Sequence, residues 1–510
     1  MSVMDKTGHP TRLICPLTAS SVEEMRAEMI AAVAEGAEMV ECRLDYLTPP
    51  PDDEQLADLL SNAPCAVLIT CRPRREGGRF SGEEHHRLAI LAAAAKFPRV
   101  EITDVELDVP PEDRPATGPI LLSHHDFQGC PADLDDIGRA MDASEAAVNK
   151  IAFTPAGPDG ALRALDVIRA CKKPTLALAM GEAGVLTRIL AKKFGAWGMF
   201  ASLHAGKESA PGQLSLAEMK HLYRWEAVND QTRVYGVIGC PIAHSMSPAI
   251  HNAAFEATGF NGVYVPLRIE PGPKSFNAFL DAARARPELD LRGLSVTIPH
   301  KENALAYVGA DHCDALAVRI GAVNTITIDE AGSLRGDNTD YAGAIDALCE
   351  AMNIPREGLA RRRVAVLGAG GASRAIVAAL RHYNAEVTLY NRTLSRAEAL
   401  AEEFGCSAAA LSKADRTEAQ IVVNCTALGM HPNVETSPVS RLSPSVRVVF
   451  DTVYNPLETR LLAMANSAGC LCVSGLDMFV NQAVAQFERW TNLPAPRDVM
   501  RDVVRGRLHE

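Results

Sequence analysis

Short apolar runs recur along residues 1–225, and between them apolar residues repeat at helical spacing. The runs predict strands at residues 12–17, 39–45, 66–72, 99–108, 119–127, 147–153, 175–180 and 197–204. Helices are predicted between most of them, including 21–35, with Ser20 or Ser21 as its cap, 83–96 and 160–171. Strands that alternate with helices in this way predict a (β/α)8 barrel, with a doubly wound sheet as the alternative.

The pattern starts again near residue 233, after a short polar stretch at 226–232 that we expect to be a linker. An apolar run from Tyr235 leads through Gly-Cys-Pro into a polar loop, with hydroxyls at Ser245 and Ser247. Pro248 suits the first turn of a helix, where a backbone N–H needs no partner. A helix capped by a serine is the structural interpretation of this stretch.

Length, charge and cysteine usage limit the classes of protein that remain. A chain of 510 residues predicts two large domains or three smaller ones. The net charge of −12 disfavours a nucleic-acid or anionic-membrane partner. The 13 cysteines include no CxxC pair, which predicts reduced thiols in a cytoplasmic protein. The N-terminus resembles neither a signal nor a transit peptide, and no apolar run approaches the ~20 residues of a membrane span.

Polar residues gather at the ends of the predicted barrel strands, where a barrel builds its active site. Glu41, Arg43 and Asp45 alternate along one strand and therefore share a face. Further strands carry the polar residues Thr70, Arg72, Asp104, Glu106, His124 and His125, and Glu76 follows the third. Because adjacent strand residues point in opposite directions, a metal shared by His124 and His125 is not expected.

Lys150 lies inside an apolar strand, where an amine costs desolvation energy unless it is paired or neutral. A snorkelling residue on an edge strand is the structural alternative. At the mouth of a barrel, burial and cationic neighbours would favour the neutral amine, which makes Lys150 a candidate for Schiff-base formation. We favour His125 as the general acid–base beside it and His124 as structural.

Six motifs of the first half occur in the order of a known family: Glu41-x-Arg43-x-Asp45, Thr70-x-Arg72 with Glu76-Gly-Gly, Ser123-x-His125-Asp-Phe, Lys150-Ile-Ala, Met180-Gly-x-x-Gly with Thr187-Arg188, and Ser209-Ala-Pro-Gly-Gln213. Over about residues 10–225 the chain resembles type I 3-dehydroquinate dehydratase. The resemblance implies an imine between Lys150 and the substrate ketone, with His125 moving protons and Glu76 orienting it.

The same resemblance assigns substrate-binding roles. Arg188 would clamp the substrate carboxylate through its planar guanidinium. Arg72, Glu41 and Arg43 would hold substrate hydroxyls and the charge network. Ser209 and Gln213 lie in a loop that would cover the barrel mouth, for which a mobile surface loop is an equally good interpretation.

In the second half, Lys301 follows a strand that carries Ser295 and Thr297, and polar strand ends supply Asn324 and Asp340. A Lys and an Asp that converge from separate loops are typical of a proton-transfer pair. The run from Arg363 then gives a strand, a glycine-rich turn and a helix, the context of a dinucleotide fingerprint, with Gly368, Gly370, Gly371 and Ala372.

The next strand ends in Asn391-Arg392-Thr393, with Arg396 beyond, and offers no acid for a ribose hydroxyl. Two arginines there favour the 2′-phosphate of NADP over NAD, although arginines on a solvated helix start are the alternative. Further strand ends carry Thr426 and Tyr454, and a late helix opens with Gly475, Met478 and Gln482.

Together these residues resemble shikimate dehydrogenase over about residues 232–490. The resemblance maps Lys301 and Asp340 to the catalytic pair and the following residues to the shikimate site: Ser245, Ser247, Thr297, Asn324, Tyr454 and Gln482. It maps cofactor contacts to Gly368, Gly370, Gly371, Ala372, Asn391, Arg392, Thr393, Arg396, Thr426, Gly475 and Met478. No metal is expected.

We therefore expect an α/β chain with a dehydratase TIM barrel at 1–226, a substrate-binding domain at 233–344, a Rossmann NADP domain at 345–475 and returning helices at 476–510. The first reaction would supply the second, because 3-dehydroshikimate is the product of one and the substrate of the other. The alternatives are a quinate dehydrogenase, which Ser245 and Ser247 disfavour, and a catalytically silent regulator, which would have lost Lys150, His125, Lys301 or Asp340. An aldolase-like barrel is disfavoured by the six motifs.

Overall fold

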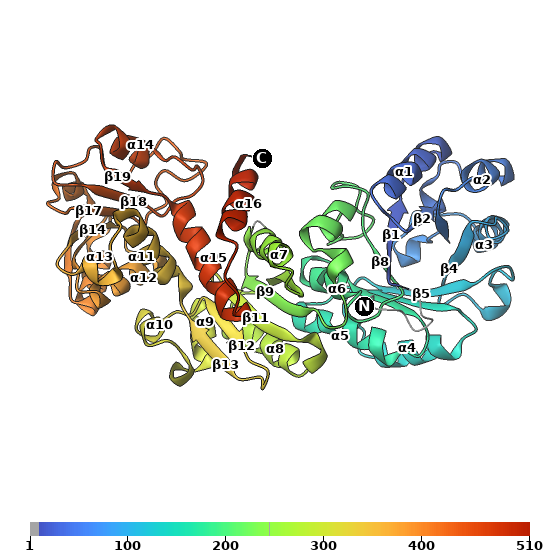
Figure 1. Ribbon diagram of the computed structural model, residues 1–510. Helices are drawn as coiled ribbons and strands as arrows, with labels where there is room; N and C mark the ends of the chain where they lie inside the picture. Colours follow the sequence, from blue (N-terminus) through green and yellow to red (C-terminus); the bar gives the residue numbers. More distant parts are fainter. Residues whose placement is uncertain (1–9, 244, 510) are drawn as a thin grey trace. The chain divides into compact units, whose positions relative to one another are not determined.

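The computed structural model describes residues 10–243 and 245–509, and its first half is an eight-stranded parallel sheet. The order is β7-β6-β5-β4-β3-β2-β1-β8, and the backbone N–H of Trp197 donates to the carbonyl of Thr175 (3.0 Å) where the two ends of the sheet meet. The (β/α)8 barrel is thus confirmed. The strands are β1 (Arg12–Leu17), β2 (Met39–Arg43), β3 (Ala66–Thr70), β4 (Val100–Glu106), β5 (Ile120–Asp126), β6 (Val148–Phe153), β7 (Thr175–Ala179) and β8 (Gly198–Phe200) (Figure 1).

Two of the barrel helices begin at a residue whose side chain satisfies a free backbone N–H of the first turn. Ser21, rather than Ser20, caps the first helix and accepts from the N–H of Glu24, and Asp52 forms a capping box with Gln55. Pro158 is the first residue of α5, where a backbone N–H needs no partner. The helices are α1 (Val22–Ala34), α2 (Asp53–Leu60), α3 (Glu84–Ala94), α4 (Leu134–Ala143), α5 (Pro158–Ala170) and α6 (Val185–Leu190).

Two strands end earlier than the sequence predicts, each because of a local turn or hydrogen bond. β2 ends at Arg43 because Leu44–Tyr46 turns into a 3-10 helix, η1. β8 ends at Phe200 because the chain then pairs locally, the N–H of Ser202 donating to the carbonyl of Leu214 (2.9 Å). Neither turn has a hydrophobic signature that could have been detected in the sequence.

The predicted linker is held against the barrel rather than lying free. Trp225 is buried, and the ammonium of Lys192 donates to the carbonyls of Trp225 and Glu226 (3.0 and 3.1 Å). The ammonium of Lys193 likewise donates to the carbonyl of Asp230 (2.8 Å). The polar composition of residues 226–232 suggested a free linker, whereas the structure shows a segment bound to the barrel through its backbone carbonyls.

The chain divides into two compact units. The first contains the barrel together with β9 (Arg233–Gly239), β10 (Gly262–Arg268) and α8 (Pro273–Arg284). Within it, the Arg286 guanidinium forms two hydrogen bonds to Asp166 of α5 (2.8 and 2.6 Å). The second unit contains α7 (Ser247–Thr258) and the chain from Arg292 onward.

A second sheet has the order β10-β9-β11-β12-β13. β9 and β10 are parallel, whereas β11 (Leu291–Val296), β12 (Thr325–Ile328) and β13 (Leu334–Asp337) pair antiparallel. α9 (Lys301–Val308) follows the end of β11 and α11 (Thr339–Met352) follows the end of β13, so their first turns lie at the same edge of the sheet, whereas α10 (Ala315–Ile320) follows α9.

The third sheet is wholly parallel, in the order β16-β15-β14-β17-β18-β19. Numbered from β14, this is the 3-2-1-4-5-6 order of a Rossmann fold. Val364 and Val366 pack on one face of β14, and Ala365 and Leu367 on the other, so helices cover both faces. The strands are β14 (Arg363–Leu367), β15 (Glu386–Asn391), β16 (Ser407–Ala410), β17 (Ile421–Asn424), β18 (Val448–Asp451) and β19 (Leu471–Val473).

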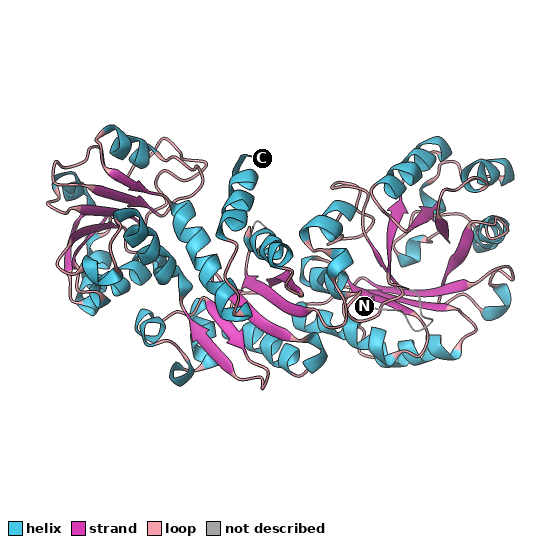
Figure 2. Cartoon of the chain, viewed as in Figure 1, coloured by secondary structure: helices cyan, strands magenta, loops and turns pink. Residues whose placement is uncertain are grey.

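Helices α12 (Gly371–His382), α13 (Leu394–Phe404) and α14 (Arg460–Ser467) follow strands of the Rossmann sheet, and α15 (Gly475–Thr491) and α16 (Arg497–His509) end the chain (Figure 2). α15 packs closely on α11: a Cβ on Gly343 would lie 2.8 Å from the backbone nitrogen of Gln482. This contact brings the predicted Gln482 alongside the helix that carries Asp340. Within residues 10–243 and 245–509, no helix combines the length and apolarity needed to cross a bilayer.

Candidate active sites

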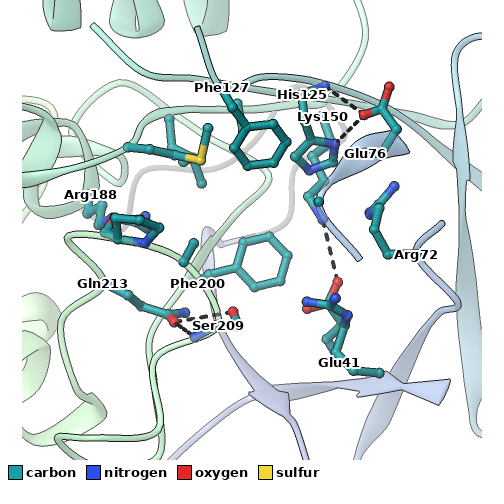
Figure 3. A pocket seen from close by; sticks show the side chains of 17 residues that line it. Glu41, Arg72, Glu76, His125, Phe127, Lys150, Arg188, Phe200, Ser209 and Gln213 are labelled. Atoms are coloured by element: carbon teal, nitrogen blue, oxygen red, sulfur yellow. Dashed lines mark hydrogen bonds and ion pairs between the residues drawn. The ribbon is translucent and has the colours of Figure 1, made fainter. Parts of the chain in front are cut away.

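A cavity of about 290 Å³ lies at the carboxyl ends of the barrel strands (Figure 3). All the barrel residues predicted as site residues line it: Glu41, Arg43, Arg72, Glu76, His125, Lys150, Arg188, Ser209 and Gln213. Strands supply four of these nine side chains, Glu41, Arg43, His125 and Lys150, and the others follow a strand or lie on helices and the 209–213 loop. The cavity wall also contains apolar side chains that would exclude water, including Leu178, Met180 and Phe200.

Lys150 extends from β6 into this cavity and is only 5% exposed. Its Nζ donates to Asp104 Oδ2 (2.9 Å) and to Glu41 Oε1 (3.5 Å), and it lies 4.5 Å from the centre of the Phe200 ring. The snorkelling alternative is therefore wrong. Two carboxylates and a ring face stabilise a cation at this atom, whether it is an ammonium or a protonated imine.

His125 and Glu76 form a close pair at the same cavity. Nδ1 of His125 lies 2.9 Å from Glu76 Oε2, which also accepts from the backbone N–H of His125 (3.0 Å). A ring N–H at Nδ1 leaves Nε2 as the free nitrogen. His124 does not line the cavity.

Burial shifts both members of this pair toward their neutral forms. It raises the pKa of Glu76 to about 7, with Arg72 opposing the shift and Glu106 adding to it. Burial, followed by the charges of Arg72 and Lys150, holds the pKa of His125 well below its ordinary value. The histidine is therefore neutral at rest and able to accept a proton.

Arg72 is the centre of a buried charge network beneath the cavity. Its Nη1 donates to Glu106 Oε1 and to Ser123 Oγ (2.7 Å each), and its Nη2 pairs with Asp104. Burial would raise the pKa of Asp104, but Arg72 and Lys150 outweigh it and keep that pKa low. Asp104 is the functional residue that the sequence analysis noticed without assigning; its signal was a carboxylate inside an apolar strand.

Glu41 and Arg43 complete the floor and wall of the cavity. Glu41 Oε1 accepts from Thr70 Oγ1 (2.7 Å) as well as from Lys150. Arg43 forms two hydrogen bonds to Asp45 (2.9 and 2.8 Å), so its charge is already balanced. Phe127, which was not predicted, also lines the cavity; its ring lies against Gly77, where a Cβ would come within 2.4 Å of it.

Arg188 differs from the other cavity arginines because no carboxylate pairs with it among the described residues. It is 1% exposed, its Nε has no hydrogen-bond partner, and Nη2 makes one long contact with the carbonyl of Pro211 (3.4 Å). Burial lowers the pKa of Arg188 from 12.5 to about 10. A buried guanidinium in this state is poised to bind an anion.

The loop over the mouth is held closed by its own hydrogen bonds. Gln213 Oε1 accepts from both the N–H (2.7 Å) and the hydroxyl (3.3 Å) of Ser209. Gly212 of this loop packs closely on Gly181, because a Cβ on Gly212 would lie 2.3 Å from the Gly181 carbonyl oxygen. The φ of Gly212, +72°, also favours glycine. The predicted lid is thus in contact with the barrel.

A second candidate site lies at the first turns of α9 and α11. Lys301 Nζ donates to Asp340 Oδ2 (2.5 Å), and both side chains keep some solvent exposure. Asn338 caps α11 by accepting from the N–H groups of Asp340 (3.2 Å) and Tyr341 (3.4 Å), which fixes the start of that helix. The sequence expectation that this Lys and Asp converge is met by the geometry.

Asn324 is buried beside this pair with its amide orientation fixed. Its Oδ1 accepts from Thr325 Oγ1 and from the N–H of Thr339 (2.7 Å each). Gln486 of α15, which the sequence analysis missed, donates to Thr325 Oγ1 (3.0 Å) and accepts from Ser295 (2.8 Å). A glutamine within an ordinary amphipathic helix gives no sequence signal of such a role.

The remaining predicted substrate residues lie in two groups. Ser245 and Ser247 precede and begin α7, but the cap position is Met246, and among the described residues Ser245 Oγ accepts from the N–H of Ser247 (3.3 Å). The serine-capped interpretation is therefore wrong, and the hydroxyls remain available. Thr297 follows β11 and is half-buried. Tyr454 stacks on Phe479 of α15, and Gln482 donates to the Phe479 carbonyl (3.0 Å).

No direct hydrogen bond joins Ser245, Ser247 or Thr297 to Lys301 in the part of the chain that the structure describes. These side chains come from different elements and do not form one bonded cluster with the Lys301–Asp340 pair. Such an arrangement suits a site that a polar substrate completes.

The turn after β14 has the geometry that a dinucleotide pyrophosphate needs. Gly368 has a φ of +109°, and a Cβ there would lie 3.1 Å from the Cys425 carbonyl. A Cβ on Gly370 or Gly371 would meet nothing within 4 Å, and no side chain caps α12. The free N–H groups of the first turn, which includes Ala372, therefore face open space.

The end of β15 offers cations that lack acidic partners. Arg392 and Arg396 are exposed and form no ion pair within the described residues, whereas Arg374 is bound by Glu403 (2.7 Å). Asn391 donates to the Thr393 carbonyl (2.8 Å) and shapes this turn. These features fit a 2′-phosphate.

Three other predicted cofactor residues differ in their surroundings. Thr426 donates its hydroxyl to Asn424 (2.7 Å) at the end of β17. A Cβ on Gly475 would lie 2.4 Å from the Thr452 carbonyl, so this glycine is required by packing at the start of α15. Met478 packs beside the Rossmann core. In the described residues, no cluster of three or more His, Cys, Asp or Glu side chains could hold a metal ion.

Comparison with known families divides the chain in a corresponding way. Residues 13–230 match the type I 3-dehydroquinase family, and residues 237–326 match the shikimate dehydrogenase substrate binding domain. Residues 351–454 match the shikimate/quinate 5-dehydrogenase family, and residues 475–505 match the shikimate 5'-dehydrogenase C-terminal domain.

Individual relatives include whole-chain matches. A bifunctional 3-dehydroquinate dehydratase/shikimate dehydrogenase of Arabidopsis thaliana, named as chloroplastic, is 37% identical over 97% of this chain and 84% of its own. A shikimate dehydrogenase (NADP(+)) of Caldanaerobacter subterraneus is 39% identical over 55% of this chain and 99% of its own. A crystal structure of a shikimate dehydrogenase with NADP+ superposes with a TM-score of 0.50 at 35% identity, covering 56% of this chain and 98% of that one.

Proposed function

This chain belongs to the bifunctional family that joins a type I 3-dehydroquinate dehydratase to a shikimate dehydrogenase, and from that premise we propose how its own residues perform the two reactions. It is an enzyme of the shikimate pathway, which leads to chorismate and the aromatic amino acids. The first activity is a lyase and the second an oxidoreductase. The observation that carries the proposal is the Lys150 amine, buried in a cavity against two carboxylates.

In the dehydratase, Lys150 Nζ attacks the ketone of 3-dehydroquinate, and loss of water leaves a protonated imine. Asp104 and Glu41 stabilise this cation as they stabilise the ammonium, because it occupies the same place. The imine draws electrons from the neighbouring carbon and acidifies its proton. Hydrolysis of the imine at the end returns the amine.

His125 moves both protons of the elimination. Its Nε2 removes the α-proton and then returns a proton to the departing hydroxyl. Glu76 holds Nδ1, which fixes the ring orientation and stabilises the imidazolium between the two steps. The neutral His125 can accept a proton, and the ionised form of Glu76 is the one that stabilises the resulting imidazolium.

Substrate orientation falls to the polar residues around the cavity. Arg188, which has no acidic partner in the part of the chain that the structure describes, binds the substrate carboxylate through its planar fork. Arg43, Arg72 and Glu41 face the ring hydroxyls, and Ser209 and Gln213 close the mouth over it. The closed loop excludes water from the imine.

In the dehydrogenase, Lys301 donates a proton to the carbonyl oxygen of 3-dehydroshikimate as it becomes an alkoxide. Asp340 accepts a hydrogen bond from the ammonium, which orients it, and takes part in the proton transfer. The substrate carboxylate and hydroxyls are bound by Ser245, Ser247, Thr297, Asn324, Tyr454 and Gln482.

We propose NADPH as the cofactor, and the residues present fit it. When bound, it supplies the hydride. Its pyrophosphate is held by the first turn of α12 with Gly368, Gly370, Gly371 and Ala372. Arg392 and Arg396, with Asn391 and Thr393, bind the 2′-phosphate, while Thr426, Gly475 and Met478 flank the nicotinamide side.

We further propose that the functional boundaries are 1–226 for the dehydratase, 233–344 for the substrate domain, 345–475 for the NADP domain and 476–510 for the returning helices. Shikimate rather than quinate is the preferred substrate, because Ser245 and Ser247 leave two hydroxyls free for it. A reducing compartment such as the cytoplasm is supported by the cysteines, all of which are free thiols.

The proposal is tested by incubating the chain with 3-dehydroquinate and NADPH while measuring shikimate, 3-dehydroshikimate and NADPH. Borohydride added with 3-dehydroquinate should reduce the imine to a stable amine, and the added mass should map to the peptide that contains Lys150. Addition at another lysine, or none during active turnover, would contradict the assignment of Lys150. Comparing kcat/KM for shikimate and quinate tests the substrate preference.

A further inference from the structure

Arg87 lies on the barrel-facing side of α3, away from the cavity, and is completely buried. It continues the helix stripe formed by Leu91 and Ala94, where an apolar side chain would fill the same position. A buried guanidinium is costly unless its charge and donors are satisfied. Its presence therefore requires an explanation beyond helix packing.

Its partners are two acids and a backbone carbonyl. Nη1 donates to the carbonyl of Cys71 (3.0 Å), and Nη2 forms an ion pair with Glu106 Oε2 (2.8 Å). Glu84, one turn earlier on the same helix, accepts from Nε and Nη2 (3.1 and 2.6 Å) and steadies the guanidinium. Glu106 is itself completely buried on β4.

From Glu106 the charges alternate up to the amine of Lys150. Glu106 Oε1 accepts from Arg72 (2.7 Å), Arg72 pairs with Asp104, and Asp104 accepts from Lys150 (2.9 Å). The buried groups comprise three cations and three carboxylates: Arg87, Arg72, Lys150, Glu106, Asp104 and Glu41. With Arg87 present and Glu106 ionised, the cluster is electrically balanced.

We propose that Arg87 is a positioning residue for the dehydratase: it keeps Glu106 ionised, so that Glu106 holds Arg72 and leaves an Asp104 oxygen for Lys150. This inference rests on the proposed role of Lys150. Neither Arg87 nor Glu106 lines the cavity, so neither touches the substrate.

The surroundings of Glu106 indicate what happens without Arg87. Burial raises the pKa of Glu106, Arg72 and Arg87 oppose this, and Asp104 adds to it. Removal of Arg87 therefore raises that pKa further and favours the protonated carboxyl. A neutral Glu106 holds Arg72 weakly, and Arg72 then competes with Lys150 for Asp104. The other titratable groups that interact with this region are Cys71, Glu76, Glu84, Asp108 and His125.

The test compares R87M, R87K and the double variant R87M/E106Q with the wild type in the full chain. Borohydride trapping with 3-dehydroquinate is followed by mass spectrometry from acid to alkaline pH. Urea unfolding followed by tryptophan fluorescence reports that the barrel of each variant is folded, because Trp197 and Trp225 are buried in it. R87K keeps the charge, and the double variant restores balance with two cations and two carboxylates.

We expect R87M to slow trapping about 10- to 100-fold at neutral pH, the range typical when a group behind a functional residue is removed. Trapping should recover as rising pH ionises Glu106 again. R87K should keep the wild-type pH profile. R87M/E106Q should lose the new pH dependence, because the group that titrates is gone.

A trapping rate and pH profile of R87M equal to the wild type would overturn the inference, as would a double variant that keeps the pH dependence of R87M. If R87M does not fold, R87M/E106Q is compared with E106Q; because Arg87 acts through the charge of Glu106, both variants should be trapped at the same slowed rate at every pH, and a double variant slower than E106Q, or an E106Q variant as fast as the wild type, would overturn the inference. Failure of the wild type to be trapped at Lys150 refutes the proposed function itself and is a separate outcome.

Discussion

Replacing Arg188 with methionine should stabilise the free enzyme while destroying substrate binding. Burial lowers the pKa of this arginine from 12.5 to about 10, so the folded chain binds its proton more weakly than the unfolded chain does. The protonated side chain therefore destabilises the fold at every pH below about 10. Methionine has a similar length and carries no charge into the cavity wall.

The magnitude follows from the same pKa. At about 1.36 kcal/mol for each tenfold change in proton affinity, the cost of burying this charge is about 3 kcal/mol. Arg188→Met should recover up to that amount, and each kcal/mol corresponds to about 2–4 °C in Tm for a domain of this size. Loss of the substrate carboxylate contact costs about 2 kcal/mol or more, which should raise KM for 3-dehydroquinate at least about 30-fold.

Unfolding in urea, followed by tryptophan fluorescence, measures the stability. Trp197 and Trp225 are buried in the first compact unit, and Trp490 lies in the second, so the signal reports mainly on the barrel. Arg163→Met is the matched control, because Arg163 is partly exposed and already bonded to the carbonyl of Pro131 (3.2 Å). The control should leave KM unchanged and should not stabilise the barrel.

An Arg188→Met variant that is less stable than the wild type would refute the argument, because it would mean that the guanidinium is satisfied in the free enzyme. An unchanged KM would separately refute its role as the carboxylate ligand. Adding 3-dehydroquinate should stabilise the wild type but not the variant, since only binding to the folded state shifts the equilibrium.

The remaining predictions concern proton transfer, the cofactor and the independence of the two sites. His125→Ala should slow dehydration by roughly 10²–10⁴ without preventing borohydride trapping, whereas loss of trapping would show that the histidine is needed earlier. Because burial raises the pKa of Glu76 to about 7, dehydratase kcat/KM should increase as pH rises through that value, and Glu76→Gln should abolish this limb of the profile. Arg392→Ala should raise KM for NADPH more than for NADH, and equal use of both cofactors by the wild type would count against a 2′-phosphate site. Lys150→Ala should still reduce 3-dehydroshikimate, Lys301→Ala should accumulate it, and mixing the two variants should restore shikimate formation; a folded variant that lost both activities would show that the sites are not independent.

Much of the fold could be predicted because its signals are local. Apolar runs marked every barrel strand, and β14, the turn at Gly368 and α12 were recognisable as a strand, a glycine-rich turn and a helix. Strand ends were less predictable, since the 3-10 turn after Arg43 depends on backbone hydrogen bonds that leave no hydrophobic pattern. The anchored linker was missed for the same reason: Lys192 and Lys193 bind its carbonyls, which every residue possesses.

The candidate sites show the same division between local and non-local information. Lys150 and His125 could be named because a polar residue inside an apolar strand is conspicuous. The partner of Lys150 could not, since Asp104 meets it only after two parallel strands are placed on either side of β5. Gln486 was missed because the pattern of its helix is that of an ordinary amphipathic helix, and because its hydrogen bonds go to residues far away in sequence.

The arginines separate the scaffold from the ligand sites more clearly than any sequence motif does. Arg43 and Arg72 are matched with carboxylates of the chain itself, so their charges serve the internal network. Arg188, Arg392 and Arg396 have no acidic partner among the described residues, in a chain whose net charge is −12 and which has carboxylates to spare. In such a chain a cation left unmatched points to an external anion, and the proposed ligands supply anions of the right kind: a substrate carboxylate at Arg188 and a cofactor 2′-phosphate at the end of β15.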